Sequence, residues 1–331
     1  MTKTDTLYQE RLTDITNELS ANISKDYVAN AGYITNLIQR IGRTVVNGTD
    51  AVNNPFSIFT APQMSLGSVI QNVKLQFTKA QDYTPNVQTD PFTINKPKDV
   101  VEYITLNDSR QYQVTIHDNE FRRMFTSEQT LGDFVAAATA SLYESMNLDQ
   151  YTAWKQHITN HCAGLDLTNG TTFPNQVKKL QLTNGPGNEG FAMELIDTVR
   201  SVEQALRNPT TDFNLQGDLS VSNDTVIIMP RSNRLEIQKT LAGVFNMEQL
   251  GFDSSAILLV DDLGTIQNDG GNEVIQAVVT DRRALVYTPT LVEGSSIFNP
   301  RGLYYNTFLT VKGSFAISSI RNFACITSTV E

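Results

Sequence analysis

A pair of histidines is the group of residues whose spacing comes nearest to a chemical motif. His157 and His161 stand at i and i+4 of a predicted helix and share one face, as zinc ligands can, and Cys162 follows. A zinc protease motif would have Glu directly after the first histidine, but Ile158 stands there. A metal site needs three or four converging ligands, and the spacing supplies no further one. The sequence therefore predicts packing and polar residues at a helix end, and no metal.

Three glycines before another predicted helix have the placement of a phosphate-binding loop. Gly185, Gly187 and Gly190 lack the Gly-Lys-Ser/Thr ending of such loops. Glu189 adds negative charge at the start of the helix, which suits the helix dipole and opposes phosphate. We interpret this segment as a linker and helix cap, and expect no cofactor.

Paired carboxylates and nucleophiles are the remaining candidates. Asp261 and Asp262 follow a predicted strand over 256–260, but no partner base or phosphate cradle is near in sequence, which favours a strand-ending turn. The chain has three histidines and no Gly-x-Ser-x-Gly elbow. We therefore expect no enzyme. A metal-dependent hydrolase using His157, His161 and the two aspartates is kept as an alternative from a different class.

Composition narrows the class of protein further. The chain has 331 residues, 40% of them hydrophobic, which is enough for about two subdomains. Charged residues make up 18%, below the usual ~25%, and a surface depleted in charge suits extensive contacts. A net charge of −10 opposes non-specific nucleic-acid binding. No signal peptide and no apolar run of about 20 residues is present, and two distant cysteines predict folding in a reducing cytoplasm.

An extended excursion followed by one very long helix is the main organising feature. Val73, Leu75 and Phe77 alternate with polar residues, as in a half-buried strand, and a proline-rich stretch follows. Returning strands are predicted over 100–106 and 112–116. A 3.6-residue period then predicts a helix over 127–160, about 50 Å long. Such a length suits a spine with smaller elements packed along it.

The other segments predict an arm, an inserted subdomain and closing strands. Residues 1–62 contain two short amphipathic helices and little core of their own. Helices and apolar strands alternate over 186–299, with strands at 225–229, 256–260 and 274–280. A boundary is expected over 294–302. Residues 303–328 alternate as β-structure, with Gly313 predicted at a turn.

Five short motifs occur in this order in a known family. They are Gln113–His117, Phe121–Phe125, Leu131–Val135, Ser141–Tyr143 and Asn147–Tyr151. With them, the chain resembles the major capsid proteins of tailed phages with the Hong Kong 97 fold, in particular those of small protein-primed short-tailed phages (Picovirinae type). The resemblance implies an α+β fold with an N-terminal arm, an extended β-hairpin loop (E-loop), a spine helix, a peripheral domain and an inserted axial domain.

The resemblance also assigns the parts of the chain. It implies an N-terminal arm at 1–62 and an extended loop at 63–118. The peripheral domain is 119–185 with 300–331, including the spine helix 127–160, and the axial domain is 186–299. The implied assembly contacts lie in the loop, and the residues chosen for them are Val73, Leu75, Phe77, Tyr83, Lys96 and Lys98.

The implied function is a structural one. Such proteins assemble with themselves, as pentamers and hexamers, into an icosahedral shell around double-stranded DNA, which is held without sequence specificity. The resemblance further implies a separate scaffolding protein, a portal, assembly in the host bacterial cytoplasm, no membrane partner and no Lys–Asn crosslinks. An encapsulin-type nanocompartment shares the fold and is the alternative within this class.

Overall fold

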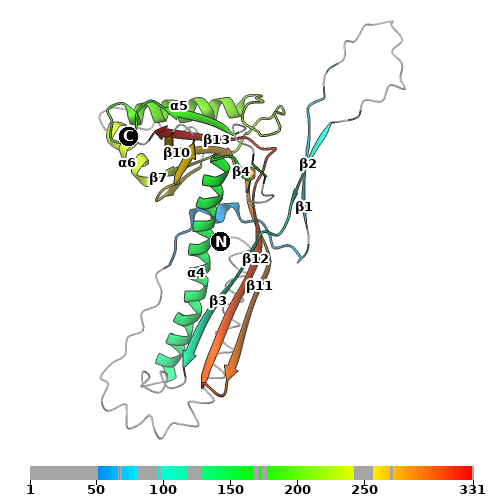
Figure 1. Ribbon diagram of the computed structural model, residues 1–331, viewed down its shortest axis with the longest axis vertical. Coiled ribbons are helices and arrows are strands. Elements are labelled where there is room, and N and C mark those ends of the chain that lie inside the picture. Colours follow the sequence, from blue (N-terminus) through cyan, green and yellow to red (C-terminus); the bar gives the residue numbers. More distant parts are fainter. Residues whose placement is uncertain are drawn as a thin grey trace. The chain divides into compact units, whose positions relative to one another are not determined.

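The computed structural model describes residues 51–65, 67, 69–78, 80, 96, 98–117, 128–166, 171–172, 177–241, 256–268 and 271–329 (Figure 1). The predicted helices of the N-terminal arm lie outside these ranges. The chain divides into two compact units. The first comprises residues 1–68, 106–154 and 287–314, and the second comprises 69–105, 155–286 and 315–331. Each unit is thus assembled from segments that are distant in sequence.

The predicted long helix is confirmed as α4, Glu128–Cys162 (Figure 1). Its 35 residues correspond to about 52 Å at 1.5 Å per residue. The buried apolar side chains of its described part recur at the expected helical spacing, at Leu142, Met146, Trp154, Ile158 and Cys162. No helix in the described part of the chain has the length and apolar character that a membrane crossing requires.

In the first unit, α4 packs against a three-stranded sheet. The strands are β11 (Leu285–Asn299), β12 (Tyr304–Ile317) and β3 (Asp108–His117), in the order β11-β12-β3. Their shared core with α4 consists of Leu142, Met146, Val292, Leu309 and Val311. The short helix η1 (Pro55–Phe59) places both of its phenylalanine rings within 6.2 Å of the Trp154 ring centroid. Trp154 is 1% exposed as a result.

Two expectations for this sheet need correction. Gly313 is not at a turn: it lies inside β12 and pairs with Asp108. A Cβ at this position would lie 2.7 Å from the ring of Tyr287, so the absent side chain makes room for the aromatic ring. The strand predicted over 112–116 is confirmed within β3, but β3 pairs with β12 rather than with the excursion.

One junction between the two compact units lies within β11. The chain passes from the second unit to the first after residue 286, within β11, and residues 287–299 belong with β12. No strand was predicted over 285–299. From Glu293 to Ile297 exposed and half-buried residues alternate, as in an antiparallel strand with one covered face.

The second unit is built around a six-stranded mixed sheet, ordered β6-β13-β10-β7-β8, with β9 beside β10. Its strands are β6 (Lys178–Leu182), β7 (Thr225–Pro230), β8 (Ala256–Val260), β9 (Thr265–Asn268), β10 (Gly271–Asp281) and β13 (Phe323–Thr329). The strands predicted at 225–229, 256–260 and 274–280 are confirmed. A short pair, β4 (Leu165–Asp166) with β5 (Thr171–Thr172), and the 3₁₀ turn η2 (Arg282–Ala284) complete the unit's small elements.

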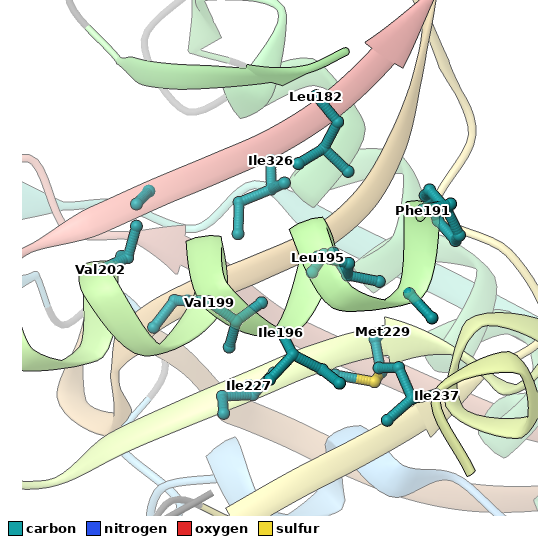
Figure 2. Packing of buried hydrophobic residues seen from close by; sticks show 14 of the residues in the cluster. Leu182, Phe191, Leu195, Ile196, Val199, Val202, Ile227, Met229, Ile237 and Ile326 are labelled. Carbon is teal, nitrogen blue, oxygen red and sulfur yellow. The ribbon is translucent and has the colours of Figure 1, made fainter. Parts of the chain in front are cut away.

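Helices α5 (Phe191–Arg207) and α6 (Arg231–Leu241) pack on one face of this sheet. Figure 2 shows Leu195, Ile196 and Val199 of α5 among the side chains of the strands. These three residues are at most 2% exposed. On β13, Phe323 and Cys325 alternate with the residues of this core and therefore point to the opposite face. There the last turn of α4 places His161 against Phe323, with ring centroids 4.6 Å apart.

The predicted excursion contains a two-stranded antiparallel ribbon, β1 (Ile70–Leu75) with β2 (Asp99–Ile104), called the ribbon below. Its register runs from Ile70 opposite Ile104 to Leu75 opposite Asp99. The Gln76 N–H donates to the Lys98 carbonyl at 2.9 Å, which extends the pairing by one step. The connection between Gln76 and Lys98 lies largely outside the described residues.

Candidate assembly surface

The ribbon has one face that is apolar and exposed. Burial alternates along both strands, so that odd-numbered residues are exposed while even-numbered residues are partly or fully buried. This exposed face carries the apolar residues Val69 (51% exposed), Val73 (47%), Leu75 (65%), Phe77 (64%), Val101 (37%) and Tyr103 (56%). Val73 and Val101 are direct cross-strand partners. Isolated two-stranded ribbons are marginally stable in water, and contiguous exposed apolar side chains mark interaction sites.

The opposite face, called the anchored face, is held to the rest of the second unit by polar contacts. Glu102 accepts hydrogen bonds through both carboxylate oxygens. Its Oε1 accepts from the Ser319 N–H at 2.7 Å, and its Oε2 accepts from the Ser318 hydroxyl at 2.8 Å. Asn72 of the neighbouring strand also donates to Oε2, at 3.3 Å. Ser318 and Ser319 belong to the turn between β12 and β13, so one carboxylate joins both ribbon strands to this turn.

Two further contacts continue along the anchored face. The Lys74 ammonium donates to the Ile320 carbonyl at 3.1 Å. Burial, followed by repulsion from Arg321, lowers the pKa of Lys74 below its ordinary value. Farther along, the Gln76 side-chain amide donates to the carboxylate of Asp218, and the Lys98 ammonium lies 3.9 Å from the same carboxylate. The anchored face thus holds the ribbon through these polar contacts and the buried Ile104, and the exposed face points outward.

The structure describes five of the six residues predicted for assembly. It places Val73, Leu75 and Phe77 together on the exposed face, while Lys98 takes part in the anchored face and Lys96 is exposed. Tyr83 lies outside the described residues. Sequence reasoning missed Val101 and Tyr103, which belong to the same exposed face. Their alternation with Val100 and Glu102 was a usable signal, but the register that brings them beside β1 was not readable.

The candidate metal ligands each have another partner. The His157 ring stacks on Phe315 with centroids 5.1 Å apart, and His161 packs against Phe323 as described above. Asp261 and Asp262 both bind the Lys155 ammonium, at 2.9 and 2.6 Å. Within the described ranges, no group of three or more His, Cys, Asp or Glu side chains converges as a metal site would require. These residues therefore serve packing and ion pairing.

The glycine segment before α5 is closed by a carboxylate of the helix itself. Glu194, in the first turn of α5, accepts from the Thr183 N–H at 2.7 Å and the Asn184 N–H at 3.0 Å. These backbone hydrogen bonds lower the pKa of Glu194. The Gly187 N–H donates to the Glu236 carboxylate at 3.0 Å, so these backbone donors are bound by carboxylates and are not free for a phosphate. The interpretation as linker and cap agrees with this geometry.

Several solved structures of similar fold come from phage capsids. A chain in the capsid structure of Staphylococcus phage Andhra is 13% identical, with a TM-score of 0.66 and coverage of 88% of each chain. A chain in the asymmetric unit of the mature capsid of phage PhiM1 is 12% identical, with a TM-score of 0.54 and coverage of 88% of this chain and 92% of that one. Both the long helix and the mixed α+β architecture predicted from the sequence are confirmed, and the fold is that of a Hong Kong 97-like phage capsid protein.

The sequence itself gives the family. The model of the Phi29-like phage major capsid protein family matches residues 3–327, so the chain belongs to that family. The major capsid protein of Streptococcus phage Cp-1 is 24% identical over 285 residues, covering 83% of this chain and 77% of that protein. That of Bacillus phage PZA is 23% identical over 312 residues, covering 92% of this chain and 65% of that protein. The chain thus spans about two thirds of the length of the Bacillus phage protein.

Proposed function

We propose that many copies of this chain form a closed icosahedral shell, built from pentamers and hexamers, around a double-stranded DNA genome. Membership of a major capsid protein family supports the shell, and the exposed face of the ribbon is the observation that carries its mechanism. In a closed assembly each contact is repeated by symmetry, so that modest contacts add up to a stable particle.

The exposed face lies on a neighbouring copy in this proposal. Its apolar residues are about half exposed, and burying each one would contribute about 1 kcal/mol, half of the usual value for a fully buried side chain. Several such residues on one ribbon would together stabilise the contact between two copies by several times this amount. The exposed face is still small enough for the unassembled subunit to stay soluble. Because the ribbon's anchored face is already engaged with its own unit, the exposed face is the one available to a second subunit.

The remaining parts of the chain have proposed roles by the same reasoning. Residues 1–62 form the arm, 63–118 the extended loop, 119–185 with 300–331 the peripheral domain, and 186–299 the axial domain around the five- and sixfold axes. The net charge of −10 suits an inner surface that does not hold DNA tightly. A scaffolding protein and a portal are the further partners, with assembly in the host cytoplasm. No step of this function calls for a catalytic residue or a cofactor.

Electron microscopy of the purified protein tests the shell, and a paired substitution tests the contact. Leu75→Ser with Tyr103→Ser should leave a soluble, folded subunit that forms no shells. The matched control is Met193→Ser with Leu235→Ser, which changes two apolar residues of α5 and α6 that are 43% and 56% exposed. Shells from the ribbon variant in normal yield would contradict the proposed contact. Deleting residues 80–97 should likewise abolish shells while leaving the protein soluble.

The contacts between copies are proposed to be non-covalent. Lys74 is engaged with the Ile320 carbonyl, and Lys98 lies beside Asp218. Denaturing electrophoresis of purified shells should therefore give a single band at 36.7 kDa. A ladder of higher bands would show crosslinks.

A further inference from the structure

We propose that Glu102 is a positioning residue that fixes the direction of the ribbon and thereby the curvature of the shell. The inference rests on the proposed function, because it concerns how the exposed face is presented to a neighbouring copy. It starts from the observation that the ribbon's attachment is unequal along its length. The strongest contact lies at its base, near Ile104, and the weaker ones lie farther out.

The base contact has the chemistry of a rigid joint. Both oxygens of Glu102 are engaged, by one backbone N–H and two side-chain donors from Ser319, Ser318 and Asn72. Hydrogen bonds to a charged acceptor are stronger than those between neutral groups. A carboxylate held through two oxygens by donors on different segments also fixes an angle, which a single bond would not do.

The turn that receives Glu102 is itself firmly held. The Ser318 N–H donates to the Ala284 carbonyl at 2.7 Å, and the Leu215 N–H donates to the Ser319 carbonyl at 3.0 Å. Ser318 is 3% exposed, and Asn322 at the end of the turn is 1% exposed. Asn322 accepts from the Asp281 N–H at 3.0 Å through its carbonyl oxygen. Glu102 is thus bonded to a segment that is fixed to the centre of the six-stranded sheet.

Each outer contact is a single hydrogen bond or a screened ion pair, so it fixes an angle less firmly than the two-oxygen contact of Glu102. Farthest out, the Gln76 amide donates one hydrogen bond to the Asp218 carboxylate. Lys98 is 3.9 Å from the same carboxylate, and its side chain is 75% exposed, so solvent screens this pair. Lys74 contributes a single bond to a carbonyl oxygen. Each ribbon strand is about 20 Å long at 3.3 Å per residue, so a tilt of about 10° at the base would move its far end by about 3 Å. A shift of that size in every copy would misplace the exposed face on its neighbour throughout the shell.

Glu102→Gln tests this role, with Glu293→Gln, an exposed glutamate on β11, as the charge-matched control. The first measurement is amide hydrogen exchange in β1 and β2 of unassembled subunits. We expect exchange there to rise at least about tenfold in Glu102→Gln, since a bond to a charged group corresponds to about that factor in the docked population. The melting temperature should change little, and the control should show neither effect.

The second measurement is the distribution of particle diameters by electron microscopy. Glu102→Gln should still assemble, but into shells of mixed size and incomplete closure, whereas the control should give uniform shells. Ser318→Ala removes one of the three donors and should give a spread of diameters between those of Glu102→Gln and the control. It replaces Glu102→Gln as the test variant if Glu102→Gln does not fold. Uniform shells of normal diameter with unchanged exchange would overturn the inference. Absence of shells from the unmodified protein would instead overturn the proposed function, and exchange would still decide whether Glu102 holds the ribbon.

Discussion

The ribbon and the six-stranded sheet belong to the same unit, but the sheet buries its apolar strand residues and the ribbon exposes many of them. In the sheet, Val226–Met229 of β7 are 0% exposed, because helices cover one face and the end of α4 lies against the other. In the ribbon, the apolar residues of the exposed face are 37–65% exposed, and on the anchored face polar contacts stand beside the buried Ile104. Apolar burial thus stabilises the subunit in one region, while in the other the apolar side chains stay exposed, as the proposed contact with a neighbouring copy requires. Substitutions can separate the two roles, and the expected effects on the free energy of unfolding of the unassembled subunit decrease in the order below.

The largest effect is expected in the core of the sheet. Leu195→Ala removes a side chain that is 0% exposed and leaves a cavity between α5 and the strands. It should lower the free energy of unfolding by about 2–5 kcal/mol in chemical denaturation. Met193→Ala, two residues earlier and 43% exposed, should change it by less than about 0.5 kcal/mol. Equal effects of the two variants would show that α5 is not packed on the sheet in solution.

A smaller effect is expected from the polar network within the same sheet. The Gln276 amide donates to the Ser328 hydroxyl at 2.8 Å, and Asn233 donates to its side-chain oxygen at 2.7 Å. All three residues are at most 2% exposed. Gln276→Ala should therefore cost about 1–3 kcal/mol, because it leaves buried polar groups without this partner. Gln111→Ala, whose bond to Thr310 is exposed, is the control and should change the denaturation midpoint little.

The same contrast explains what could be predicted from the sequence. The helix over 127–160 could be predicted from its 3.6-residue period, and the strands of the second unit from their short apolar runs. Both patterns follow directly from which residues are buried. The pairing of β3 with β12 was not readable, since the partners are almost 200 residues apart and alternation carries no register. Gly313 was misread because a glycine that admits the Tyr287 ring looks like a turn glycine in sequence.

The exposed face of the ribbon, the candidate assembly surface, was predictable only in part for a related reason. Val73, Leu75 and Phe77 show an alternating pattern, which predicts a strand with one apolar face. Whether that face turns toward or away from the subunit depends on the partners of the other face. Those partners, Ser318 and Asp218, come from remote turns. Alternation in the sequence therefore gave the face, and only the fold gave its direction.

An effect that depends on pH is expected at Asp281, at the end of β10. Burial acts to raise the pKa of this carboxyl, but hydrogen bonds from the Arg283 side chain and N–H outweigh it, so the pKa lies below its ordinary value of 3.8. A depressed pKa adds stability that is complete above the ordinary value and is lost as pH falls through the folded-state pKa. Because the Arg283 side chain is 58% exposed, solvent weakens this contribution.

Asp281→Asn tests this sign. The stability difference between the unmodified protein and the variant should be constant from neutral pH to about pH 5 and should shrink as pH falls below 3.8. Unfolding curves recorded at several pH values measure it, and Arg283→Gln should reduce the same pH dependence. A difference that stays constant down to pH 2 would mean that the carboxylate gains nothing from its partners in the folded state.

The smallest effect on the isolated subunit is expected on the exposed face of the ribbon. Val73→Thr with Val101→Thr keeps the branched shape and strand preference of a cross-strand pair while adding two hydroxyls. Since both residues are already in water, at 47% and 37% exposure, the free energy of unfolding should change by less than about 0.5 kcal/mol. Assembly should nevertheless weaken, because each hydroxyl loses water when the face is covered by a neighbour. The free energy of unfolding and the yield of shells should both be measured on this double variant. If the free energy of unfolding falls as much as in Leu195→Ala, the subunit itself covers this face, and the contrast between the ribbon and the sheet is wrong.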